Sequence, residues 1–167
     1  PDVIVSGINI GKNVGLSFIF SSGTVGACLE ANIAGIPALA LSQELQPEDF
    51  LHWDRERSFR PQTATLLKSL SDHVIPAIWE DLTLCSKSPP TTWNVNMPYT
   101  RSGSPEIIKT RLGHSFYFSC FEKHEGHYRH KFSKATIDPD SDTDEMVVRS
   151  GHVSATEIDI RAFGQAI

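Results

Sequence analysis

The chain has 167 residues, 40% of them hydrophobic, so it is long enough to bury the core of a single domain. Fifteen Lys and Arg residues against twenty Asp and Glu residues give a net charge of −5, which argues against nucleic-acid polymers and anionic membranes as partners. No apolar run approaches the length of a membrane span. The three cysteines lack metal or redox spacing, and a reducing, cytoplasmic setting is the simplest expectation.

Residues 1–43 carry the pattern of a strand, a helix and a second strand. Residues 3–5 (VIV) and 38–41 (ALAL) are short apolar runs of the kind expected in strands buried on both faces. Between them, residues 23–34 favour a helix that follows two serines and ends at Gly35. Such a unit closes as a right-handed crossover, so the loop before the helix is expected at the carboxyl end of a parallel strand, where open α/β sheets place ligands.

That loop concentrates groups that can bind a phosphate beside a metal ion. Its glycines let the backbone approach a ligand closely, and Asn9 and Asn13 offer amide oxygens and NH2 donors. Ser22, Thr24 and the free N–H groups of the helix start can donate to an anion. Oxygen ligands without sulfur suit Mg2+ or Mn2+. Composition alone leaves open the alternative that these glycines and asparagines only turn the chain and that a serine only caps the helix.

Four stretches together resemble one known family. They are PDVIVSGIN at 1–9, GKNVG at 11–15, SGTVGA at 22–27 and GIPA at 35–38. These motifs closely resemble those of the stationary-phase survival protein SurE family of 5'/3'-nucleotidases, and weaker similarity extends over nearly the whole chain. The resemblance implies metal-dependent hydrolysis of phosphate monoesters, chiefly nucleoside 5'- and 3'-monophosphates, with Mg2+ or Mn2+ as cofactor.

The resemblance also implies roles for particular residues. Asn9 is expected to hold the divalent ion in part, so that the ion polarises the phosphoryl group and lowers the pKa of a bound water. Asn13, Ser22, Gly23 and Thr24 are expected to bind the phosphate oxygens, with the helix N-terminus stabilising developing charge. No residue is assigned as the catalytic nucleophile or base.

The family's remaining metal ligands do not occur in this sequence. In the resembled family an earlier strand ends in Asn-Asp-Asp-Gly, whose two aspartates bind the metal, whereas no Asp-Asp pair occurs here. We therefore expect the chain to be the later portion of a longer protein. The alternative is a truncated, catalytically inactive relative that binds phosphate or only forms oligomers, and the sequence upstream of Pro1 would discriminate the two.

The middle of the chain predicts elements that cover and complete the sheet. Residues 45–60 are polar and aromatic and are expected to form a surface loop, whereas 61–80 have the apolar spacing of a covering helix. Residues 92–98 are expected to form another core strand. Asn94 and Asn96 share one face of it, where they either orient the loop or, as the safer expectation, make hydrogen bonds at the strand end.

The last third of the chain predicts mainly strands, at 106–112, 115–121, 128–132 and 152–160. Residues 141–154 resemble the family's closing segment, where a strand pair reaches out and builds the oligomer, so a homodimer or homotetramer through the C-terminal strands is expected. His124, His127 and His130 suggest a metal site, but a hairpin tip at Gly126 favours a solvated hairpin.

These features predict an α/β protein: a Rossmann-like three-layer sandwich with a mainly parallel sheet and a C-terminal antiparallel β extension. Residues 1–100 are expected to form a partial α/β core that lacks its first strand, and 101–167 a hairpin-rich extension of the same domain. The expected partner is a nucleoside monophosphate or another small phosphomonoester, with no nucleic-acid polymer and no membrane.

Overall fold

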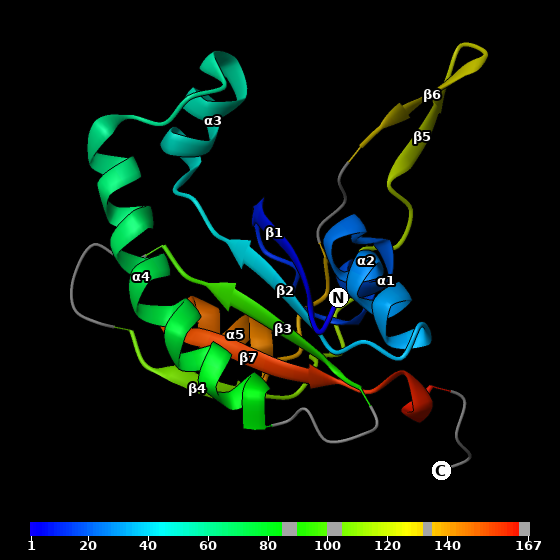
Figure 1. The fold of residues 1–167 in the computed structure, drawn as a ribbon. Helices are drawn as coiled ribbons and strands as arrows, with labels where there is room; N and C mark the ends of the chain where they lie inside the picture. The colour runs from blue at the N-terminus through cyan, green and yellow to red at the C-terminus, as the bar shows by residue number, and fades with distance from the viewer. Residues whose placement is uncertain (85–89, 100–104, 132–134, 164–167) are drawn as a thin grey trace.

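The computed structural model describes residues 1–84, 90–99, 105–131 and 135–163, which are built on a five-stranded sheet (Figure 1). Its order is β1 (Ile4–Ile10), β2 (Ala38–Gln43), β3 (Thr92–Met97), β7 (Val153–Ile158) and β4 (Ile107–Thr110). β1, β2 and β3 are parallel to one another, β7 is antiparallel to β3, and β4 is parallel to β7. The sheet is therefore mainly parallel, as the sequence predicted.

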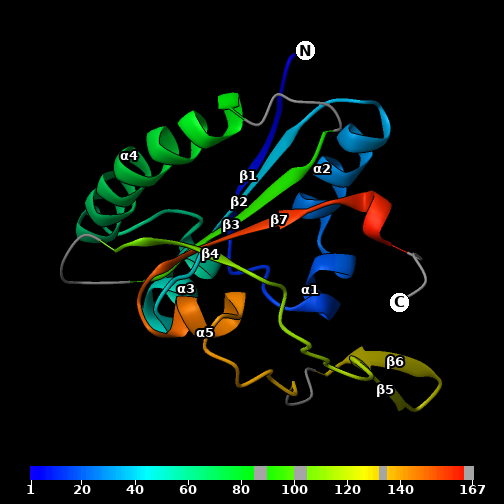
Figure 2. The same cartoon turned by 90° about the horizontal axis from the view of Figure 1, so that it is seen from below.

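Helices cover both faces of this sheet, which confirms the three-layer arrangement (Figure 2). The helices are α1 (Leu16–Ser21), α2 (Gly23–Ile33), α3 (Pro47–Glu56), α4 (Pro61–Leu84) and α5 (Asp144–Arg149), followed by the 3-10 turn η1 (Ile160–Ala162). Helix α4 packs Leu70, Val74 and Ile78 on one face, against a core that includes Leu39 and Val95. Helices α1, α2 and α5 lie on the other face, where the core contains Val25, Cys28, Ala38 and Ala40.

Successive residues of β2 and β3 divide between these two layers. Leu39 and Leu41 join the core under α4, whereas Ala38 and Ala40 join the core under α2. This is the alternation that a strand buried on both faces requires. On β3 the positions facing α4 are apolar, while the positions facing α2 and α5 include Asn94 and Asn96. The polar groups of the central strands are thus collected on one face.

β1 differs from the prediction that its first residues are buried on both faces. It is the edge strand of the sheet and pairs only with β2 among the described strands. As a consequence, half of the Val5 surface (50%) and 41% of the Ile8 surface are exposed. An apolar edge of this kind is open to pairing with another chain segment.

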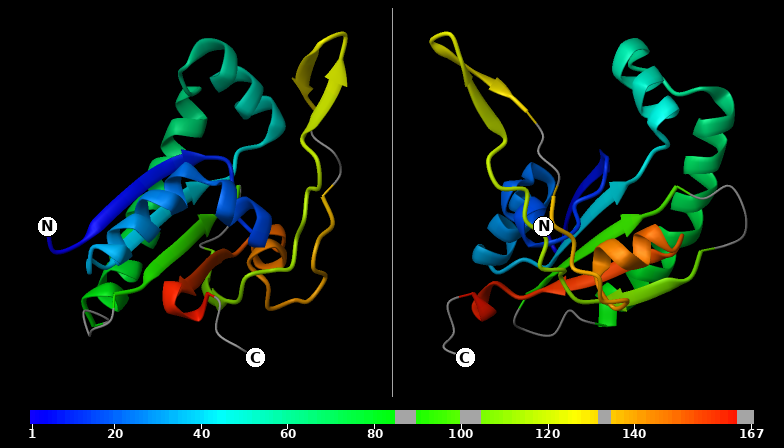
Figure 3. Two further views of the ribbon diagram at one scale, coloured as in Figure 1. Left: turned by 90° about the vertical axis from the view of Figure 1, so that its right-hand side faces the viewer. Right: turned by 180° about the vertical axis from the view of Figure 1, so that it is seen from behind.

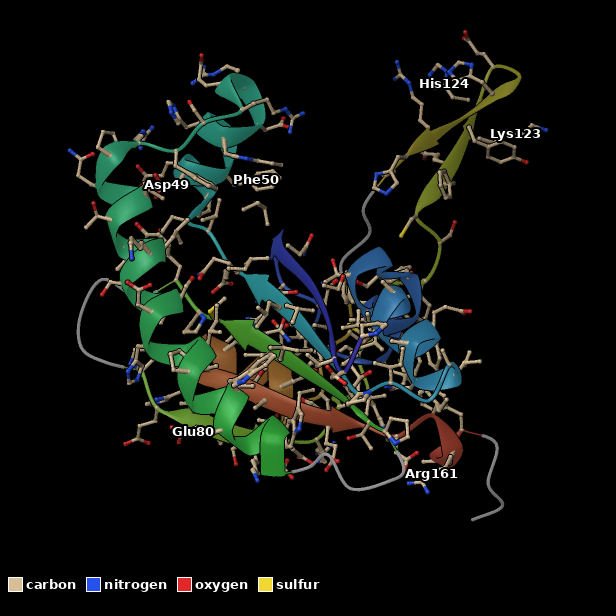
Figure 4. The ribbon with its side chains drawn as sticks, viewed as in Figure 1. Asp49, Phe50, Glu80, Lys123, His124 and Arg161 are labelled. Carbon is tan, nitrogen blue, oxygen red and sulfur yellow. The ribbon has the colours of Figure 1, made fainter. Side chains whose placement is uncertain are left out.

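The prediction of a surface loop at 45–60 is wrong, because Pro47–Glu56 form helix α3. Pro47 occupies the first turn, and Arg57 ends the helix in the left-handed region at φ 51°. The buried carboxylate of Asp49 accepts hydrogen bonds from Thr63 Oγ1 (2.7 Å) and Tyr99 OH (3.1 Å), which fixes α3 to α4 and to the end of β3 (Figure 4). The helix is thus held by tertiary contacts rather than by an apolar stripe of its own.

Two of the C-terminal expectations also change. The predicted strand at 115–121 is reduced to a single bridge between Phe116 and Thr136. The segment 141–154 forms α5 and the start of β7 inside the main body, not a projecting strand pair. The element that projects is the antiparallel hairpin of β5 (Phe121–His124) and β6 (His127–His130), all of whose residues are exposed (Figure 3).

Arg111 fastens the end of β4 to the loop that leads into α5. Its guanidinium donates to Asp138 (2.9 Å), Asp140 (2.6 Å) and Asp142 (3.1 Å). The N–H group of His114 and then the Arg111 guanidinium lower the pKa of the Asp138 carboxyl to about 2, so this carboxylate is ionised at neutral pH. The three-aspartate loop is therefore neutralised in part by a cation of the same chain and is tied to the end of β4.

No helix among the described residues is long and apolar enough to cross a membrane. The division of the chain at residue 100 stays a prediction. β7 and β4 complete the sheet that β1, β2 and β3 begin.

Candidate functional site

A row of polar side chains crosses the sheet near the carboxyl ends of β1, β2 and β3. Asn9 on β1 is in register with Ser42 on β2, Ser42 with Asn96 on β3, and Asn96 with Ser154 on β7. Ser42, Asn96 and Ser154 are completely buried, so the row lies beneath the loop that follows β1. The site therefore occupies the edge of the sheet at which open α/β folds bind ligands.

Asn13 is bound to this row through both its backbone and its side chain. Its N–H donates to Asn96 Oδ1 (2.7 Å), and its carbonyl oxygen accepts from Asn94 Nδ2 (2.9 Å) and Asn96 Nδ2 (3.1 Å). Its side-chain amide donates to Ser42 Oγ (2.8 Å). Two asparagines of β3 thus take the place of backbone partners for the loop, which is how a buried non-regular segment stays satisfied.

Asn9 keeps its amide oxygen available. Its Nδ2 donates to the Gly11 carbonyl (3.2 Å), and among the described residues no donor reaches Oδ1. Gly11 turns the chain at φ +113° and returns its N–H to Gln43 O (2.8 Å), which directs the loop back over β2. Asn9 is therefore placed as a partly exposed oxygen donor at the end of an edge strand.

Lys12 and Val14, on either side of Asn13, lie next to a cavity. They line this cavity of about 310 Å³ together with Phe18, Ser115 and residues of α5. Lys12 Nζ forms ion pairs with Glu44 (3.1 Å) and Glu145 (3.1 Å). The positive charge of Lys12 is thus shared between two carboxylates of its own chain.

The start of α2 combines capping with groups that remain suited to an anion. Ser22 is the N-cap residue, and its Oγ accepts the N–H of Val25 (3.2 Å). Gly23 is exposed and Thr24 half-buried in the first turn. The first N–H groups of a helix have no intrahelical acceptor, so this turn can donate to an anion.

The site residues fall into two groups. Asn9 and Asn13 both neighbour Ser42, whereas Ser22, Gly23 and Thr24 follow them along the chain after residues 14–21, which include α1. No hydrogen bond among the described residues joins the two groups.

Sequence reasoning missed Ser42 and the contact of Asp144 with the loop. Ser42 ends an otherwise apolar run, and that polar interruption at the end of a buried strand was the signal available for it. Asp144 lies 129 residues from the loop whose Gly15 N–H it accepts (2.7 Å), and no local pattern announces such a contact. Asn94 and Asn96 take the loop-orienting role that the sequence left open.

The described residues do not by themselves fit a complete metal site. Within 1–84, 90–99, 105–131 and 135–163 there is no group of three His, Cys, Asp or Glu side chains that could hold an ion. Near the loop, the Asn9 amide oxygen is a neutral donor, Ser42 is buried and accepts from Asn13, and the carboxylates of Glu44 and Glu145 pair with Lys12. A hard dication binds mainly to carboxylates, so anionic ligands beyond these residues are needed.

The two hydrogen bonds between Asn96 and Asn13, together with the one from Asn94, form a clamp on the loop that is expected to stabilise the fold. Asn96→Leu removes a donor and an acceptor and leaves the N–H of Asn13 buried without a partner, so we expect the free energy of unfolding to fall by about 2–4 kcal/mol. Asn94→Leu, which removes only one hydrogen bond, serves as the matched comparison with a smaller loss. Urea denaturation measures both, and an equal loss for the two variants would contradict the clamp.

The fold defines the chain as an α/β protein, with its candidate site at the carboxyl ends of the parallel strands. The family model "Survival protein SurE" matches residues 1–119, and the chain belongs to the SurE family.

Curated relatives align with this chain along nearly its whole length. The 5'-nucleotidase SurE of Caldanaerobacter subterraneus subsp. tengcongensis is 35% identical over 163 residues, which cover 95% of this chain and 57% of that protein. The 5'-nucleotidase SurE of Pelotomaculum thermopropionicum is 35% identical over 165 residues, or 95% and 55% of the two chains. The chain thus spans a little over half the length of these relatives.

A solved structure shows the same fold. The crystal structure of the SurE protein from Aquifex aeolicus superimposes with a TM-score of 0.52 at 24% identity, over 98% of this chain and 62% of that one.

Proposed function

We propose that the protein is a metal-dependent phosphomonoesterase that hydrolyses nucleoside 5'-monophosphates and also 3'-monophosphates. The alignment of 163 residues with a protein named 5'-nucleotidase SurE carries this proposal. The polar row at the carboxyl ends of the parallel strands supports it, since this is where the fold presents ligand-binding groups.

In this proposal Asn9 gives one neutral oxygen ligand to Mg2+ or Mn2+. Its unengaged Oδ1 at the end of β1 is the supporting observation. A bound divalent ion supplies a Lewis acid and a water of lowered pKa. Such an ion would also require carboxylate ligands, and the described residues offer no group of three acidic, His or Cys side chains for it.

The phosphate is proposed to bind Asn13 and the first turn of α2 at Ser22, Gly23 and Thr24. The half-buried Thr24 hydroxyl and the helix N-terminus supply donors, and they lie where a dianionic phosphate is favoured. Because Ser22 Oγ already accepts a hydrogen bond from Val25, its hydroxyl hydrogen is the part left for the ligand.

The proposed hydrogen bond from Thr24 to phosphate can be tested by measuring phosphate binding, without an activity assay. Thr24→Val keeps the side-chain shape and removes a donor, so it is expected to weaken the binding of inorganic phosphate by roughly 1–3 kcal/mol. Ser21→Ala is the control, because the Ser21 hydroxyl donates to Ser17 O (3.0 Å) within its own helix. Calorimetry that gives the same affinity for Thr24→Val and the parent protein would remove Thr24 from the phosphate site.

The activity is tested with the complete natural protein and a panel of substrates. Phosphate release from 5'-AMP, 3'-AMP and p-nitrophenyl phosphate in the presence of Mn2+ is expected to show higher kcat/KM for the two nucleotides. Binding of phosphate without release from any of the three would favour the catalytically inactive alternative.

We further infer that the protein is a homodimer or homotetramer assembled through the β5–β6 hairpin. This hairpin stands away from the body (Figures 3 and 4), and 63% of Phe121 and 71% of Tyr128 are exposed on it. Replacing both aromatics by serine is expected to lower the mass measured by light scattering, whereas Lys123→Ser is not. An unchanged mass for the double variant would exclude the hairpin as the interface.

A further inference from the structure

Asp144 is a completely buried carboxylate that gathers three backbone N–H groups. Oδ2 accepts from Gly15 (2.7 Å), and Oδ1 accepts from Gly113 (3.0 Å) and Glu145 (2.9 Å). Burial raises the pKa of Asp144, and the three N–H groups act in the opposite direction. One side chain thus joins the loop after β1, the segment after β4 and the first turn of α5.

The backbones around this carboxylate approach closely, and at Gly15 the approach requires glycine. Gly15 has φ +74°, and a Cβ added there would lie 2.6 Å from Ser115 Cβ. A Cβ on Gly113 would lie 3.3 Å from Asp144 Oδ1. Leu16 N–H donates to Gly113 O (2.9 Å), which draws the two segments together. The three backbone segments therefore pack closely at the Asp144 carboxylate.

Capping of its own helix does not account for Asp144. Thr143 is the N-cap residue of α5, and its Oγ1 accepts the N–H of Met146. The carboxylate instead reaches Gly15, two residues beyond Asn13, and the intervening Val14 is buried. The loop is consequently held from two directions, by Asn94 and Asn96 at Asn13 and by Asp144 at Gly15.

We propose that Asp144 is a positioning residue that fixes the backbone from Asn13 to Gly15 and thereby sets the phosphate-binding geometry of the loop. Its effect on catalysis rests on the proposed phosphomonoesterase function. Its effect on the loop does not, because the hydrogen bond to Gly15 exists independently of any substrate.

The test is Asp144→Asn in the complete protein, compared with Asp142→Asn. An amide at position 144 carries only one oxygen. Placed at the Oδ1 position, this oxygen keeps the N–H groups of Gly113 and Glu145 paired and turns the NH2 group toward Gly15, whereas the opposite orientation leaves two N–H groups without an acceptor. The favoured orientation therefore removes the acceptor of the Gly15 N–H. Asp142 is an exposed aspartate two residues away that pairs with Arg111 and does not contact the loop, so Asp142→Asn controls for the chemical change.

Asp144→Asn is expected to lower kcat for 5'-AMP by about 10- to 100-fold, because a small displacement of a binding loop has an effect of this size. KM is expected to change less than kcat. The amide hydrogen of Gly15 is expected to exchange at least about tenfold faster, since a hydrogen bond to a carboxylate is lost. The amide of Val153, which donates to Glu106 O in the sheet, reports unchanged global folding.

The outcomes separate the proposals. Wild-type kcat in Asp144→Asn together with an unchanged Gly15 exchange rate overturns the positioning role. If the parent protein releases no phosphate, the proposed function fails and the exchange rate still decides the role of Asp144. If Asp144→Asn does not fold, Asp144→Glu keeps the charge but moves the carboxylate by one methylene, and wild-type kcat and Gly15 exchange in that variant would likewise overturn the proposal.

Discussion

The 167-residue chain, purified by itself and supplied with Mn2+, is expected to release no appreciable phosphate from 5'-AMP, whereas the complete protein does. The donors that it presents to an ion near β1 are neutral, and a dication gains little by exchanging water for an amide oxygen. A pair of unit charges about 4 Å apart near a protein surface attracts by about 4 kcal/mol, so missing carboxylates remove most of the binding.

Phosphate release from 5'-AMP and p-nitrophenyl phosphate measures this difference at matched protein concentration. The chain must be checked by sedimentation first, because the exposed Val5 and Ile8 on the edge strand are expected to promote self-association. Turnover comparable to that of the complete protein would mean that carboxylates of this chain hold the ion. Asp144 is not among them, since it is completely buried and bound to three N–H groups of its own chain.

In the complete protein, Asn9→Ala is expected to lower kcat by at least about tenfold and to raise the Mn2+ concentration needed for half-maximal activity. Removing one oxygen ligand weakens the hold on the ion. Folding is expected to stay intact, because the Asn9 side chain makes its described hydrogen bond only to Gly11, two residues away.

Asn32→Ala provides the matched control for Asn9→Ala. Asn32 lies at the opposite end of α2 and is buried, with hydrogen bonds to Ile36 O (3.0 Å) and Thr92 Oγ1 (2.6 Å). Its loss should reduce the free energy of unfolding and leave the metal requirement unchanged. If Asn9→Ala has wild-type activity at limiting Mn2+, Asn9 is not a ligand.

The sequence predicted the elements whose signals are local. The strand–helix–strand unit of β1, α2 and β2, the helix α4 and the strands β3, β4 and β7 all follow from apolar periodicity, caps and glycine stops. The first crossover predicted the mainly parallel sheet. The glycine- and asparagine-rich motifs of the first 38 residues predicted the family.

What the sequence did not reveal depends on contacts between distant segments. Helix α3 is fixed by Asp49 through Thr63 and Tyr99, and the edge position of β1 is a property of sheet order rather than of its β-branched residues. Helix α1 was assigned to a loop because its six residues are too few to show a helical period.

The candidate site divides in the same way. The sequence of the loop indicated Asn9 and Asn13 as candidate site residues, and the common face of one strand indicated Asn94 and Asn96. The sequence does not reveal that Asn13 binds Asn94 and Asn96, because the hydrogen bonds join residues more than eighty positions apart. The roles of Asn9, Asn13, Ser22, Gly23 and Thr24 in binding, and the cytoplasmic setting, stay predictions.

Phosphate release from 5'-AMP before and after removal of divalent ions decides whether the complete protein is a metal-dependent nucleotidase, as we propose. We predict that EDTA abolishes release and that Mn2+ or Mg2+ restores it in the parent protein, while Asn9→Ala regains little at the same ion concentration. Full activity in EDTA, or no release of phosphate under any condition, would contradict the claim.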